Sequence, residues 1–83
     1  MKPIEYQSLA ERNARASVAR RTTAQLLTDF DVTDAMPITP NLAMVRGWLM
    51  DELEKRDPQA FNSWMDYEEK NYTNVSPRRF FTA

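Results

Sequence analysis

Apolar residues recur at spacings of three and four along three stretches of the chain, and no useful length shows the strict alternation typical of strands. Ser8 followed by Glu11 matches a capping box, which predicts a first helix starting near Leu9. Its apolar face comprises Leu9, Ala16, Ala19, Thr23, Leu26, Leu27 and Phe30. The pattern therefore predicts one long helix over residues 9–29. Because Arg12 interrupts this face, its first two turns are expected to be weakly anchored.

Two further helices are predicted from paired start signals. Thr39 before Pro40 and Asp57 before Pro58 each place a capping side chain ahead of a proline in the first helical turn. The apolar periodicity that follows predicts helices over residues 40–56 and 58–70. Residues 31–39 lack periodicity and are expected to form a loop.

These elements predict an all-α fold, a small three-helix domain. A long N-terminal helix precedes a helical hairpin or corner, and the C-terminal tail is extended or short-helical. One domain spans residues 1–83, with 1–8 and 71–83 as flexible or peripheral arms. The expected core consists of Leu26, Leu27, Phe30, Leu42, Val45, Trp48, Leu49, Leu53, Phe61, Trp64 and Met65.

Composition removes most familiar kinds of active site. The chain has no histidine and no cysteine, so the commonest general base, thiolate chemistry and disulfides are all excluded. The acidic stretch from Asp29 to Asp34 opens like a calcium loop, but Asp34 stands where glycine is needed and Pro40 where a glutamate is needed. With only 83 residues, the chain also has few residues with which to enclose a catalytic cleft. We therefore expect no enzyme, no catalytic residue, no metal, no cofactor and no small-molecule substrate.

Apolar runs in this chain are too short for a membrane span or a secretory signal. We expect no membrane partner and a cytoplasmic location.

Charge is unevenly distributed. Residues 1–28 carry five basic residues against two acids, residues 29–69 carry ten acids against three basic residues, and residues 70–83 carry three basic residues and no acid. Two basic arms thus flank an acidic middle. Arg12, Arg15, Arg20 and Arg21 resemble a short arginine-rich helix that binds nucleic acid, RNA more than DNA. Neutralisation of these charges within the molecule is the alternative interpretation.

Aromatic and methionine side chains point to a different function. Met44, Met50 and Tyr67 lie off the main apolar faces of their helices, and Phe80 and Phe81 follow Arg78 and Arg79. Adaptable apolar side chains beside arginines are typical of protein contact surfaces. The first hypothesis is therefore a non-enzymatic interaction module, such as a small regulator or inhibitor, that binds a protein partner or a second copy. Alternatively, the terminal phenylalanines seal the domain's own core.

Overall fold

The computed structural model describes residues 3–81, with side chains from Leu9 onward. This part of the chain forms α1 (Pro3–Ala19), α2 (Thr23–Asp34), α3 (Pro40–Arg56), α4 (Pro58–Asn71) and the short 3-10 helix η1 (Pro77–Arg79). The all-α prediction is confirmed. The three-helix prediction is wrong, because the long first helix is divided into α1 and α2, which begin and end at other residues than expected.

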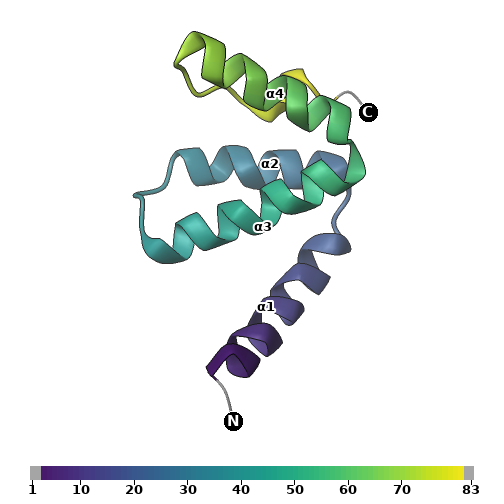
Figure 1. The fold of residues 1–83 in the computed structure, drawn as a ribbon, viewed down its shortest axis with the longest axis vertical. Coiled ribbons are helices and arrows are strands. Elements are labelled where there is room, and N and C mark those ends of the chain that lie inside the picture. The colour runs from purple at the N-terminus through teal and green to yellow at the C-terminus, as the bar shows by residue number, and fades with distance from the viewer. Residues whose placement is uncertain (1–2, 82–83) are drawn as a thin grey trace.

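The helices surround α3, which packs against α1, α2 and α4. Figure 1 shows α2 and α3 side by side in opposite directions, whereas α1 points away from the other three helices. The radius of gyration is 13.7 Å, against about 12 Å expected for a compact domain of this length. The projecting α1 accounts for this elongation. None of the helices in the described part of the chain is long and apolar enough to cross a membrane.

Both proline start signals work as predicted. Thr39 Oγ1 accepts a hydrogen bond from Leu42 N at 3.1 Å, and Asp57 Oδ1 accepts one from Ala60 N at 3.0 Å. Each cap satisfies a backbone N–H that the first helical turn leaves without a partner. The bounds of α3 and α4 therefore agree closely with the expected 40–56 and 58–70.

The break between α1 and α2 lies at residues 20–22 and has a local cause. Thr22 forms a complete capping box with Gln25, in which Thr22 Oγ1 accepts from Gln25 N and Gln25 Oε1 accepts from Thr22 N. This second start signal ends the preceding helix. The helix expected to end at residue 29 instead continues as α2 to Asp34, so the connecting loop is shorter than the predicted 31–39.

Arg56 holds this break from the end of α3. Its Nη2 donates to the carbonyl oxygens of Ala19 at 3.2 Å and Arg21 at 2.6 Å, and its Nη1 donates to Thr23 Oγ1 at 3.2 Å. Its Nε pairs with Glu52 at 2.9 Å. The Arg56 guanidinium therefore donates hydrogen bonds to backbone carbonyl oxygens that have no partner within the helix where α1 ends.

Trp64 lies at the centre of the core, with 1% of its surface exposed. Its ring meets Phe30 and Phe61 edge to face, with centroid separations of 5.1 and 5.7 Å. The other buried apolar residues are Leu26, Leu27, Leu49, Leu53, Ala60 and Phe81. Edge-to-face packing adds to the stabilisation from apolar burial alone.

Part of the predicted core lies nearer the surface. Val45 is exposed, while Leu42 and Trp48 are half-buried. The prediction was wrong for Val45, which lies on a part of α3 that α2 does not bury. Phe61 and Met65 are partly buried and pack against the core, while Ala60 and Phe81 are core residues that the prediction missed.

The tail after α4 folds back onto the body. Tyr72 ends α4 in the left-handed region at φ 50°. Trp64 Nε1 then donates to the carbonyl oxygen of Val75 at 3.0 Å, and Glu68 Oε2 accepts from Val75 N at 3.0 Å. Ser76 Oγ donates to Asp31 at 2.7 Å. These bonds hold the tail, yellow in Figure 1, against the body, and Phe81 is buried in the core. Residues 1–2 and 82–83, the ends of the two expected arms, lie outside the described residues.

Candidate functional site

Four of the seven exposed large apolar side chains of the described residues lie at or just after the turn between α2 and α3. Ile38 is 91% exposed, Met44 52% and Met36 49%. We call residues 36–45 the tip surface. It lies at the end of the α2–α3 pair opposite the junction with α1 (Figure 1). A cluster of this kind on a small domain is typical of a contact site for another molecule.

Two hollows flank the turn. The first, of about 440 Å³, is lined by apolar residues of the turn and of α3, by Thr33 and Asp34 of α2, and by Arg46 and Asn74. The second, of about 380 Å³, is open and almost wholly apolar, and is lined by Met36, Pro37, Thr39, Asn41, Leu42 and Val45. Ile38 lines the first hollow and stands beside the second. The tip surface therefore has a projecting aliphatic side chain next to an apolar depression.

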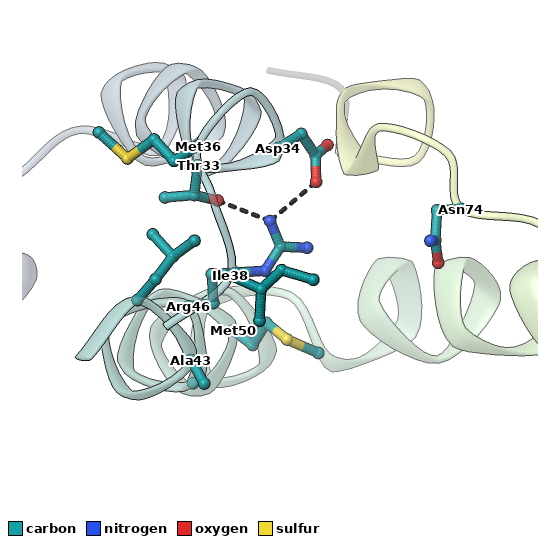
Figure 2. Close-up of a pocket in the computed structure, with 10 residues that line it drawn as sticks. Thr33, Asp34, Met36, Ile38, Ala43, Arg46, Met50 and Asn74 are labelled. Atoms are coloured by element: carbon teal, nitrogen blue, oxygen red, sulfur yellow. Dashed lines mark hydrogen bonds and ion pairs between the residues drawn. The ribbon is translucent and has the colours of Figure 1, made fainter. Parts of the chain in front are cut away.

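Arg46 forms a wall of the first hollow and joins α3 to the end of α2. Its Nη1 donates to Thr33 Oγ1 and to Asp34 Oδ1, both at 2.7 Å (Figure 2). Its guanidinium also lies over the ring of Phe30, 4.2 Å from the centroid. Thr33 in turn donates to the carbonyl oxygen of Phe30 at 2.6 Å. These contacts neutralise the one charge that α3 presents here and fix the two helices that carry the tip surface.

A sequence signal for this surface exists, although the periodicity analysis missed it. Residues 35–45 form the longest run of the chain without a charged side chain, in a protein whose charged residues make up 28%. The run includes Met36, Ile38, Leu42, Met44 and Val45. An uncharged run at a helix–helix turn is unusual because such turns are normally polar.

The predicted contact residues fall in three places. Met44 is exposed on the tip surface, and Met50 is half-buried in the wall of its first hollow. Tyr67 is half-buried on α4, where its ring lies 5.7 Å from that of Phe80.

The other tail residues mainly attach the tail to the body. Arg79 lies over the ring of Tyr67 at 5.0 Å. Arg78 donates to Thr28 Oγ1 at 2.9 Å and pairs with Asp31 at 3.3 Å. Phe81 is 5% exposed, which agrees with the alternative in which the terminal phenylalanines seal the domain's own core.

The four arginines suggested for nucleic acid are partly committed to ion pairs. Arg15 donates to Glu11 at 2.7 Å and to Asp51 at 2.9 Å. These hydrogen bonds, the one to Glu11 most of all, raise the pKa of the Arg15 guanidinium above its ordinary value. Arg21 holds both oxygens of Asp29, at 2.6 and 2.9 Å. Among the described residues, Arg12 and Arg20 have no ion-pair partner. The break at residues 20–22 also prevents one continuous basic helix.

The acidic side chains that the structure describes do not assemble a metal site. From Leu9 to Phe81, no three of His, Cys, Asp or Glu lie together as ligands. Asp29, Asp31 and Asp34 pair separately with Arg21, Arg78 and Arg46. The stretch that opened like a calcium loop is thus the end of α2 with its ion pairs.

Comparison with known proteins adds no family to this picture. No protein-family model, no curated protein and no solved structure matches the chain. Any function must therefore be inferred from its residues and their arrangement.

Proposed function

We propose that the protein is a non-enzymatic interaction module that binds another protein chain through the tip surface. The observation that carries the proposal is the gathering of Met36, Ile38, Met44 and Val45, all exposed, around two hollows, of which the second is almost wholly apolar. Leaving these side chains in water forgoes stabilisation that a partner would recover by covering them. Aliphatic residues and methionine also adapt their shape to an apolar partner.

The apolar side chains of the tip surface contribute little to the domain's own core and are available for contact with a partner. Ile38 lies on a turn between two well-capped helices, and its side chain packs on nothing that would explain an isoleucine there. Arg46 joins the two helices on either side of this turn, because it donates hydrogen bonds to Thr33 and Asp34 at the end of α2. A braced turn presents its apolar side chains with little ordering cost on binding.

Affinity capture with point variants tests the proposal. The tagged full chain is used to capture proteins, with nuclease treatment, from the cells that produce it. Ile38→Asp and Val45→Asp are expected to abolish capture of the partner. The partner can be a different protein or an untagged copy of this chain. Leu9→Asp is the matched control, because Leu9 is also an exposed aliphatic residue but lies on α1.

Two outcomes would contradict the proposal. In one, the Ile38 and Val45 variants capture the same proteins as the wild type. In the other, capture is lost on nuclease treatment and depends on Arg12 and Arg20, which would favour nucleic-acid binding with its steep salt dependence.

A further inference from the structure

Resting on the proposed function, we propose that the partner of the tip surface is a second copy of this chain, held by reciprocal insertion of Ile38 into the apolar hollow formed by Met36, Pro37, Leu42 and Val45. This arrangement is a two-fold symmetric dimer, in which each copy contributes the same patch.

The shape of the tip surface supports reciprocal contact. Ile38 projects into solvent with 91% of its surface exposed. The second hollow lies beside it and is lined by other residues of the same turn and of α3. A projection and a depression that are adjacent but separate allow two copies to fill each other's depression at once. Such a contact closes at two copies, whereas a projection and depression on opposite faces would build a filament.

The absence of charge favours a second copy over a differently charged partner. A two-fold axis brings identical groups together, so a face with a net charge repels its own copy. Residues 35–45 contain no charged side chain, and the bordering charges of Asp34 and Arg46 neutralise each other at 2.7 Å. Elsewhere the molecule is strongly patterned in charge, with ten acids among residues 29–69. The tip surface is thus the face on which self-contact meets least repulsion.

The size of the surface sets the expected strength. A stable interface of ordinary size buries about 800 Å² per partner, which is about one eighth of the 6102 Å² that this chain exposes. The tip surface involves only one turn and the first half of α3, so we expect it to bury no more than this. We expect a dimer that dissociates at micromolar concentrations and equilibrates quickly.

Sedimentation equilibrium of the full chain tests the dimer, from about 5 µM to about 1 mM. The weight-average mass of the wild type is expected to rise from 9.7 kDa toward twice that value. Ile38→Asp is expected to raise the dimer dissociation constant at least about 100-fold, because both copies carry the change at a central contact. Leu9→Asp is expected to associate like the wild type. Circular dichroism confirms that each variant is folded, which an exposed turn residue such as Ile38 should not affect.

Cysteine cross-linking tests the reciprocal geometry, since the chain has no cysteine of its own. An oxidised mixture of Ile38→Cys and Val45→Cys copies is expected to form a mixed disulfide dimer faster than a mixture of Leu9→Cys and Val45→Cys. Equal rates in the two mixtures would overturn the proposed geometry.

Failure of the dimer and failure of the proposed function are distinguishable. A wild type that stays at 9.7 kDa up to about 1 mM, or an Ile38→Asp variant that associates normally, overturns the dimer. If Ile38-dependent capture of a different protein then persists, the proposed function stands with another partner. If no Ile38-dependent capture occurs, both fall.

Discussion

Replacing Arg56 by alanine should weaken the attachment of α1 to the rest of the fold. The guanidinium donates to the carbonyl oxygens of Ala19 and Arg21 and to Thr23 Oγ1, and it pairs with Glu52. Only 22% of the Arg56 side chain and 15% of the Glu52 side chain are exposed. In the variant, the mostly buried Glu52 carboxylate would lose its ion-pair partner, and the carbonyl oxygens of Ala19 and Arg21 would lose their hydrogen-bond donor.

The magnitude follows from these contacts. Hydrogen bonds to charged groups contribute about 1.5–3 kcal/mol each, but water replaces part of the loss at this half-covered site. Loss of the whole set should therefore lower the free energy of unfolding by about 2–3 kcal/mol, or the melting temperature by about 10–20 °C. Arg56→Lys keeps the charge but cannot span three acceptors, so it should recover less than half of the loss.

Urea denaturation followed by tryptophan fluorescence measures the effect. The control is Lys70→Ala, because Lys70 and Asp66 also form an i,i+4 pair but remain 72% and 59% exposed. That change should cost less than about 0.5 kcal/mol. A double-mutant cycle with Glu52→Gln separates the ion pair from the bonds to the break at residues 20–22. If Arg56→Ala costs no more than Lys70→Ala, the assignment of Arg56 as the residue that holds the break is refuted.

Three further predictions concern stability. Trp64→Ala should lower the free energy of unfolding by about 3–5 kcal/mol and unfold much of the population. Trp48→Ala, at a half-buried position, should lower it by about 1–2 kcal/mol. Thermal melts by circular dichroism measure both, and a larger loss for Trp48→Ala would contradict the prediction. Deleting residues 76–83 should lower the melting temperature, because it removes buried Phe81 and Pro77 and the Arg78–Asp31 pair; an unchanged melt would mean that the tail does not dock. Gly47→Ala should raise the free energy of unfolding by about 0.5–1 kcal/mol, since Gly47 lies inside α3 and a Cβ there meets no atom within 4 Å; destabilisation in urea would contradict it.

Local chemistry in the sequence was sufficient to predict where α3 and α4 begin. A cap depends on a side chain and a backbone N–H only three residues apart, so Thr39 and Asp57 act in the same way whatever surrounds them. Thr22 and Gln25 form an equally local signal, but the apolar face runs past them without interruption to Phe30. Periodicity alone therefore favoured one long helix. The cap starts α2 at this break, and Arg56, 35 residues from Arg21, adds a donor to the carbonyl oxygen of Arg21.

The sequence by itself determined an all-α chain without histidine or cysteine chemistry, because helix periodicity and composition can be read residue by residue. Tertiary structure decided which apolar faces are covered. Val45 has the spacing of a core residue and is exposed, whereas Phe81, which follows the last helix, is buried in the same cluster as Trp64. Burial depends on which other segment lies over a face, and that is set by packing between residues distant in sequence. The tip surface is exposed for the same reason: it lies at the end of the α2–α3 pair opposite the junction with α1, where α1 does not reach it.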